Sequence, residues 1–163
     1  LGAKTEFWRA HRQYAGIIHF VYLTCSYPGV YTADHFADVT KLKLDTAFAD
    51  FLGEAFKPLG VYINFFQPTI PSGTTREFTV MMVNDETRRR KGQLTLALET
   101  KSGKLLARSQ QVFDLSALGA KSYPVSLAIP RVVGECVLQA VATAEGQRAK
   151  QATVSRRWLS VTE

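Results

Sequence analysis

The residues with the clearest capacity for chemistry follow an apolar run near the start of the chain. An aromatic ring can stack on the face of a sugar, and a carboxylate or imidazole can exchange hydrogen bonds with its hydroxyl groups. The side chains of these types in this run and after it are Tyr22, Tyr27, Asp34, His35 and Phe36. The alternative is a structural loop, in which Asp34 caps a turn and Phe36 packs inward.

No catalytic residue, metal site or cofactor site is predicted. The apolar run Ile17–Leu23 carries no Asp or Glu. The spacing of His11, His19 and His35 matches no short metal-ligand motif, and no acidic or cysteine cluster completes one. The glycine at 73 belongs to a Pro-Ser-Gly turn and not to a phosphate-binding loop. Cys25 and Cys136 are expected to be free, mostly buried thiols.

The elements that would position these residues begin with a helix and a strand. Thr5 is expected to cap a helix that continues through Tyr14 and Ala15 and ends at Gly16. The run Ile17–Leu23 is apolar on both faces, which is typical of a strand inside a parallel sheet. A long loop through Pro28-Gly29 and His35-Phe36 then follows.

A second helix is expected before the hydrophobic pattern changes to that of β-strands. Asp45 or Thr46 is expected to cap it, and Lys57-Pro58 to stop it. From residue 59 onward, apolar and polar residues alternate with the period of a sheet that has one face in a core. Turns at 101–103 and 145–147 contain glycine and indicate hairpins. Seven strands are predicted: Val61–Gln67, Arg76–Asn84, Gln93–Glu99, Lys104–Phe113, Lys121–Ile129, Glu135–Ala144 and Ala149–Val161.

We therefore predict a mainly β fold. Its larger part, residues 59–163, is expected to be an immunoglobulin-like β-sandwich of about seven strands. Residues 1–58 supply a helix-strand-helix segment, and one strand makes no parallel sheet by itself. This segment either packs on the sandwich or is the last unit of a larger α/β domain, which is the interpretation that we favour.

Several segments of the chain carry a family resemblance. The chain resembles the C-terminal region of glycoside hydrolases of the β-galactosidase and β-glucuronidase type, family two or a close relative. The segments that carry the resemblance are Arg9–Arg12, Ala15–Leu23, Thr32–Val39, Ala55–Phe66, Val83–Glu86 and Gly92–Leu94.

The resemblance implies a (β/α)8 barrel enzyme with a two-carboxylate mechanism and trailing β-sandwich domains. Residues 1–58 would be the end of the barrel and a linker. Active sites of such barrels lie at the C-terminal ends of the strands, so the resemblance implies a group of sugar-contacting side chains there: Tyr22, Tyr27, Asp34, His35 and Phe36. The catalytic glutamates of that family lie on earlier barrel strands, so we expect this chain alone to be inactive and the rest of the parent hydrolase to be its partner. The orphan strand Ile17–Leu23 is expected to dock on its own sandwich or to pair with a second copy. The family resemblance favours a periplasmic or secreted location.

Composition and charge bear on whether the chain is folded and on which partners it could bind. A hydrophobic content of 46% with 21% charged residues indicates a folded chain. The net charge of +6 lies largely in Arg88–Lys91 and Arg156-Arg157. We interpret the first run as a solvated basic loop and predict no nucleic-acid partner, because no aromatic residue interleaves with it. No apolar segment is long enough to cross a bilayer.

The rival hypothesis is a free-standing module that binds a glycan or another protein. Large aromatic residues of the chain either pack in the core or line a carbohydrate-binding face: Trp8, Phe65, Phe66, Phe78, Phe113 and Trp158.

Overall fold

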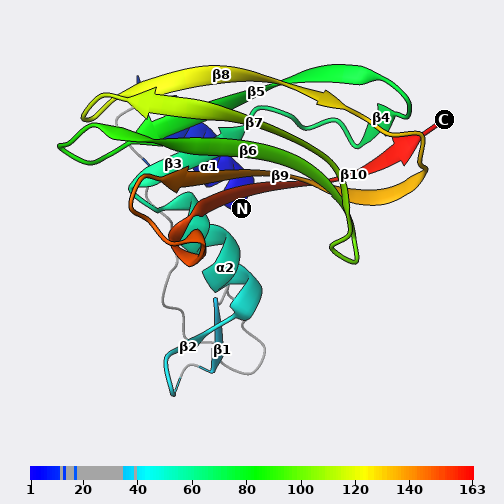
Figure 1. Cartoon of the computed structure of the whole chain (residues 1–163). Coiled ribbons are helices and arrows are strands. Elements are labelled where there is room, and N and C mark those ends of the chain that lie inside the picture. The colour runs from blue at the N-terminus through cyan, green and yellow to red at the C-terminus, as the bar shows by residue number, and fades with distance from the viewer. Residues whose placement is uncertain (12, 14–16, 18–34, 39) are drawn as a thin grey trace.

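The computed structural model describes residues 1–11, 13, 17, 35–38 and 40–163. In this part the chain is mainly β, with two sheets stacked face to face and two helices along one side (Figure 1). This arrangement confirms the predicted mainly β sandwich. The sandwich strands are β3 (Leu59–Ile63), β4 (Thr69–Pro71), β5 (Thr75–Asn84), β6 (Arg90–Thr100), β7 (Leu105–Leu115), β8 (Ala120–Ala128), β9 (Gly134–Ala144) and β10 (Thr153–Thr162).

The two sheets have different widths. One sheet has the strand order β4-β10-β9-β6-β7, and the other has the order β3-β5-β8. All neighbouring strands are antiparallel except β4 and β10, which run parallel where Ile70 lies opposite Val161. The chain changes sheets at every connection from β3 to β9 except the one between β6 and β7. Such crossings are typical of an immunoglobulin-like sandwich.

The core lies between the two sheets and follows from the alternation of the sequence. Leu94, Leu96 and Leu98 on β6 are fully buried, and so are Val80 on β5 and Leu138 on β9. Each of these strands turns its alternate side chains toward the facing sheet. Replacing one such leucine by alanine typically costs about 2–5 kcal/mol, so this core supplies much of the stability of the fold.

All seven predicted strands overlap observed ones, and the structure adds β4. The last predicted strand is wrong at its start, because a short 3-10 helix (Ala149–Gln151) precedes β10. Both predicted hairpin glycines have positive φ, +85° at Gly103 and +77° at Gly146. An L side chain rarely adopts this conformation, which explains why glycine stands at these two turns.

The N-terminal helix α1 (Gly2–Ala10) begins earlier and ends earlier than predicted. Leu1 and not Thr5 is the N-cap residue, and the Thr5 hydroxyl lies 3.4 Å from the Leu1 carbonyl oxygen inside the helix. A threonine can make this contact from within a helix, so its presence did not mark the start. The helix ends because the backbone of His11 leaves the helical region at φ −100° and ψ 72°.

The second helix, α2 (Thr46–Ala55), is capped as predicted by Asp45, whose Oδ1 accepts a 2.9 Å hydrogen bond from the Phe48 amide. The predicted loop before it is wrong at Phe36, because β1 (Phe36–Asp38) and β2 (Lys43–Leu44) form a small antiparallel hairpin. Phe36 lies opposite Leu44, and this apolar pair explains why the segment extends.

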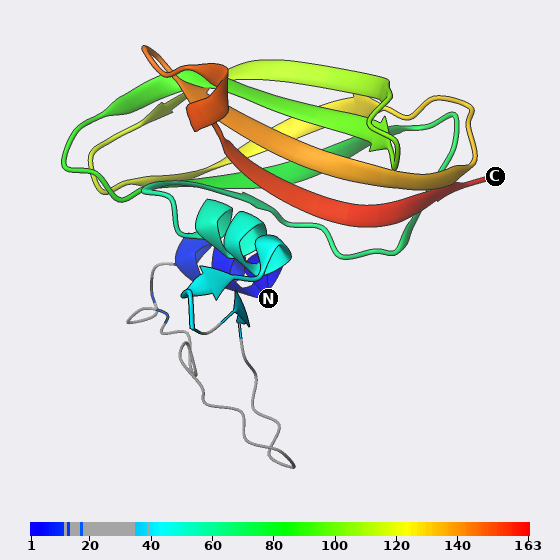
Figure 2. The same ribbon diagram turned by 90° about the horizontal axis from the view of Figure 1, so that it is seen from below.

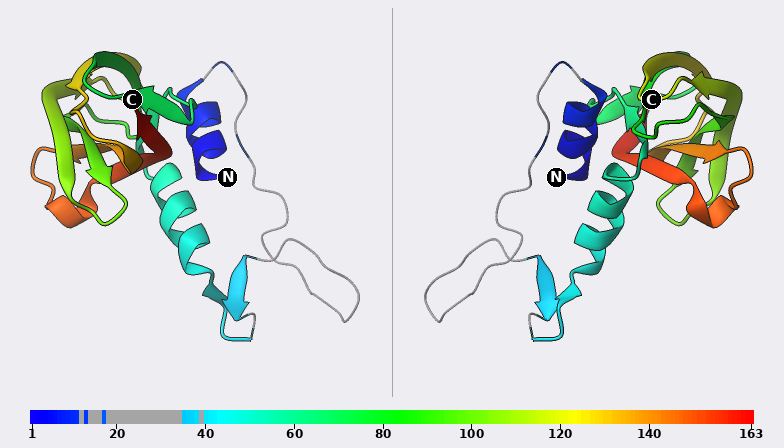
Figure 3. Two further views of the ribbon diagram at one scale, coloured as in Figure 1. Left: turned by 90° about the vertical axis from the view of Figure 1, so that its right-hand side faces the viewer. Right: turned by 90° about the vertical axis from the view of Figure 1, so that its left-hand side faces the viewer.

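Helices α1 and α2 lie side by side against β3 and β10 (Figures 2 and 3). We call these two helices the helical layer. The predicted strand Ile17–Leu23, apart from Ile17, and the predicted helix end at 14–16 lie outside the described residues. The pairing of that strand, with this sandwich or with a second copy, and the division at residue 58 stay predictions.

Candidate functional site

The structure describes two of the five predicted sugar contacts, His35 and Phe36. The His35 ring stacks on Phe48 with the ring centroids 4.1 Å apart and an interplanar angle of 7°, and its carbonyl accepts a 2.8 Å hydrogen bond from the Asp45 amide. Both residues therefore lie at the root of the hairpin, beside the start of α2. Their role toward a sugar stays a prediction, and the other three contacts lie outside the described residues: Tyr22, Tyr27 and Asp34.

The helical layer is joined to the sandwich by a buried polar cluster. Glu6 on α1 accepts hydrogen bonds from the Ser155 hydroxyl at 2.7 Å and from Arg157 Nη2 at 2.9 Å. Arg157 Nη2 also donates to the Ile63 carbonyl at 2.8 Å, so the guanidinium connects α1, β10 and β3. Only 6% of the Glu6 side chain and 7% of the Arg157 side chain are exposed. The cluster thus places a full ion pair inside the protein.

The electrostatics of this cluster are set by burial. Desolvation raises the pKa of Glu6 above its ordinary value, and the nearby Arg157 and the Ser155 hydrogen bond oppose the rise. Burial also raises the pKa of Tyr62. The Arg157 guanidinium lies over two aromatic rings, 5.4 Å from the Tyr62 centroid and 5.2 Å from the Phe66 centroid. These cation–π contacts compensate part of the cost of burying the charge.

A second group of contacts fixes α2 and the chain that follows it. Glu54 accepts a 2.8 Å hydrogen bond from the Val154 amide of β10. Lys57 Nζ pairs with Glu54 at 2.6 Å and donates to the Ala152 carbonyl at 2.7 Å. Arg9 of α1 contacts the carbonyls of Ala55 and Lys57 and the carboxylate of Asp85. The two helices are therefore fixed to each other and to the sandwich at several points.

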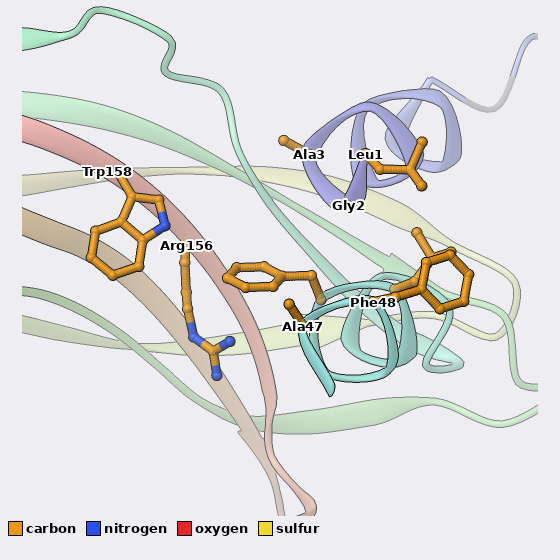
Figure 4. A pocket seen from close by; sticks show the side chains of 9 residues that line it. Leu1, Gly2, Ala3, Ala47, Phe48, Arg156 and Trp158 are labelled. Carbon is orange, nitrogen blue, oxygen red and sulfur yellow. The ribbon is translucent and has the colours of Figure 1, made fainter. Parts of the chain in front are cut away.

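A groove of about 340 Å³ is lined by the N-terminal parts of the two helices and by β10 (Figure 4). Trp158 and Arg156 line it from the strand, Phe48 and Ala47 from α2, and Leu1 from α1. Most of the lining is apolar. The most exposed aromatic residue of this groove is Trp158, at 59%.

A second hollow of about 240 Å³ lies on the other side of Trp158. Lys101 and Glu135 line it and form a 2.9 Å ion pair with each other. Cys136 also borders this hollow but is buried as a free thiol, as predicted, and burial raises the pKa of that thiol. Cys25 lies outside the described residues.

The aromatic residues divide between the two predicted roles. Three pack in the core: Phe65, Phe78 and Phe113. Three others are exposed by 43–61%: Trp8, Phe66 and Trp158. Alternate residues of β10 point to opposite faces of the sheet, so Trp158 faces away from the side on which its neighbours Arg157 and Leu159 are buried. The register of the strand had to be known before this alternation could place Trp158.

The four cations of the basic run Arg88–Lys91 share two carboxylates. Arg88 pairs with Glu86 at 2.7 Å, and Arg89 pairs with Asp114 at 2.5 Å. The other two cations of the run contact the same carboxylates. The hydrogen bond from Arg89 holds the pKa of Asp114 below its usual value. Each cation of this run therefore contacts a carboxylate, but only half of the positive charge is offset, and the absence of a nucleic-acid partner stays a prediction.

Two further searches cover only the part of the chain that the structure describes. No three His, Cys, Asp or Glu residues there come together in a way that could hold a metal ion. Neither described helix has the length and apolar character that crossing a membrane requires.

Comparison with known proteins gives only distant structural likenesses. No model of a protein family and no curated protein matches the chain. A family 123 glycoside hydrolase from Clostridium perfringens aligns over 64% of this chain and 27% of its own, with 10% identity and a TM-score of 0.44. A β-glucosidase from Listeria innocua aligns over 66% and 16%, with 11% identity and a TM-score of 0.49.

A further solved structure is the C-terminal domain of wzt, which aligns over 63% of this chain and 70% of its own, with 17% identity and a TM-score of 0.47. This chain thus spans only a small part of the length of these two hydrolases. The neighbours include glycoside hydrolases at low identity, but membership of family two does not follow from them.

Proposed function

We propose that this chain is a non-catalytic accessory domain of a larger glycoside hydrolase, in which the sandwich supports the end of the catalytic domain. The observation that carries the proposal is the rigid attachment of the helical layer through the buried pair of Glu6 and Arg157, 2.9 Å apart. The segments that resemble the C-terminal region of family-two hydrolases support it as well.

The outward side of the helical layer is suited to further packing. Its neighbourhood exposes large apolar side chains, with Trp8 exposed by 43%, Phe56 by 44% and Leu42 by 66%. Exposed large apolar residues in a protein of this size can mark an interaction surface. A catalytic domain seated there would cover these residues, and the sandwich would hold the helices in position beneath it.

The carboxylates near the helical layer support a non-catalytic role. Glycosidases that retain configuration hold an acid and a nucleophile carboxyl group about 5–5.5 Å apart. Here Glu6, Asp50 and Glu54 are each bonded to a different cation, namely Arg157, Arg156 and Lys57. These carboxylates hold the helices and the strands through ion pairs, which favours a structural role for them over a catalytic one.

A first test assays the chain alone on a panel of chromogenic glycosides. We expect hydrolysis no faster than in a heat-denatured sample of the same chain. Hydrolysis that scales with the concentration of the folded chain would overturn the proposal, because the accessory role assigns catalysis to another part of the protein.

A second test compares one substitution in two settings. Phe56→Glu is expected to leave the thermal stability of the isolated chain nearly unchanged, since Phe56 is partly exposed there. In the longer protein the same substitution should lower stability and activity, because it places a charge in the interface with the catalytic domain. Val133→Glu is the matched control: Val133 is 66% exposed and lies between β8 and β9, away from the helices. Equal effects of the two substitutions in the longer protein would contradict the proposal.

A further inference from the structure

Trp158 stands between two hollows on the surface of the sandwich. Its side chain projects outward from β10, and the residue is 59% exposed. The groove beside the helical layer borders it on one side, and the hollow beside Lys101 and Glu135 borders it on the other. A large rigid ring between two concavities offers a flat apolar platform with space for a ligand that continues past both of its edges.

Paired charges flank the platform on both sides. Arg156 Nη1 lies 2.7 Å from Asp50 Oδ2 beside the first groove. Lys101 Nζ lies 2.9 Å from Glu135 Oε2 beside the second hollow. Each pair presents hydrogen-bond donors and acceptors together, so it can both donate to and accept from neighbouring hydroxyl groups. Because each cation already has a carboxylate partner, neither pair offers uncompensated positive charge to an acidic ligand.

The strands next to β10 extend the polar surroundings of the ring. Arg156 lies opposite Gln139 of β9, and Gln139 lies opposite Ala97 of β6. The Gln139 amide donates a 2.8 Å hydrogen bond to Glu99, which follows two residues after Ala97 on the same face of β6. An amide–carboxylate pair therefore lies on the sheet face that carries Trp158.

We propose that Trp158 is the stacking platform of a binding site for a neutral chain of pyranose sugars. One face of such a ring carries C–H groups that pack on the indole, and its hydroxyl groups point sideways toward the flanking ion pairs. Hollows on both sides of the platform fit consecutive sugar rings better than one isolated ring. This site is centred on Trp158 of the sandwich and does not require a catalytic domain to be seated on the helical layer, so the two proposals fail separately.

The two tryptophans of the chain make the site directly measurable. In a Trp8→Phe variant, intrinsic fluorescence reports on Trp158 alone. The probes are neutral hexasaccharides of β-1,4-glucose, β-1,4-mannose and α-1,4-glucose, with a galacturonic acid hexamer as the charged comparison, titrated by fluorescence and calorimetry. We expect at least one neutral hexasaccharide to bind and to shift the emission of Trp158.

Substitutions then locate the bound sugar. Trp158→Ala should weaken binding at least about tenfold, as expected for the loss of one large apolar contact, while Trp158→Tyr retains part of the affinity. Trp8→Ala is the matched control and should leave affinity unchanged, and circular dichroism checks the fold of each variant. The proposal is overturned if no neutral hexasaccharide binds, if only the acidic hexamer binds, or if binding survives Trp158→Ala unchanged.

Discussion

Removing the Glu6 carboxylate is expected to be among the most damaging changes to a charged residue in the described part of the chain. Glu6→Ala leaves the Arg157 guanidinium, 7% exposed, without its counter-charge and deprives the Ser155 hydroxyl of its acceptor. Breaking a buried ion pair in this way costs about 3–5 kcal/mol. With a urea m-value of about 2 kcal/mol/M, the unfolding midpoint should fall by about 2 M.

The control is the neighbouring ion pair of Arg156 and Asp50, which also joins a helix to β10. Its side chains are exposed by 24% and 51%, so Asp50→Ala should cost at most about 1 kcal/mol. Urea denaturation followed by circular dichroism measures both costs, and amide exchange of α1 shows whether the helix detaches first. Equal costs for Glu6→Ala and Asp50→Ala would refute the reasoning.

The pH dependence gives a second check on the same cluster. Burial raises the pKa of Glu6 above 4.5 in the folded chain, so the folded state binds this proton more tightly than the unfolded state. The resulting stabilisation is complete below about pH 4.5 and is lost as the pH rises through the folded pKa. Glu6→Gln imitates the protonated form: it also removes the counter-charge of Arg157 but keeps an oxygen that can accept from the Ser155 hydroxyl, so it should cost less than Glu6→Ala by about the value of that hydrogen bond. The stability of the native chain relative to Glu6→Gln should fall as the pH rises, and a rise would contradict this assignment.

Two further predictions concern the backbone. Gly92→Ala should destabilise the chain by about 1–3 kcal/mol or more, because an added Cβ would collide with the Thr143 carbonyl of β9. Gly53→Ala should stabilise it by about 0.5–1 kcal/mol, since nothing lies within 4 Å of an added Cβ there and glycine disfavours a helix interior. Thermal denaturation of both variants tests the pair, and a change of Tm in the same direction for both would contradict it. Asp45→Ala should cost about 1 kcal/mol by removing the acceptor for the Phe48 amide, with Thr46→Ala as the nearly neutral control, and a Tm equal to that of the control would contradict the cap.

The sequence predicts those parts of the fold that depend on local patterns. The alternation of Leu94, Leu96 and Leu98 identifies β6, and the Asp45 cap identifies the start of α2. The strand β4 was not predicted, because its three residues are too few to show a periodic pattern and its partner β10 lies far along the chain. Local pattern also misplaced the start of α1, since a threonine can occupy a cap or a helix interior.

The candidate sites depend mostly on residues that are far apart in the sequence and meet only in the fold, and no local sequence pattern indicates such contacts. Glu6 and Arg157 are separated by 151 positions, and neither residue type suggests the other. From the sequence, Trp158 could lie either in the core or on an exposed face. The alternation of β10 is compatible with both until the pairing with the neighbouring strands is known. The ion pair between Lys101 and Glu135 likewise arises only when β6 and β9 pair.

The anchoring of the helical layer also bears on aggregation. The part of β10 before the parallel contact with β4 is an outer strand of its sheet, and β3 is an outer strand of the other. Glu54 and Lys57 occupy the backbone groups of Val154 and Ala152 that a foreign strand would otherwise pair with. Outer strands with free backbone groups are templates for association between chains. A version of the chain cut at residue 58 would lose both side chains, so it would expose this template and tend to self-associate.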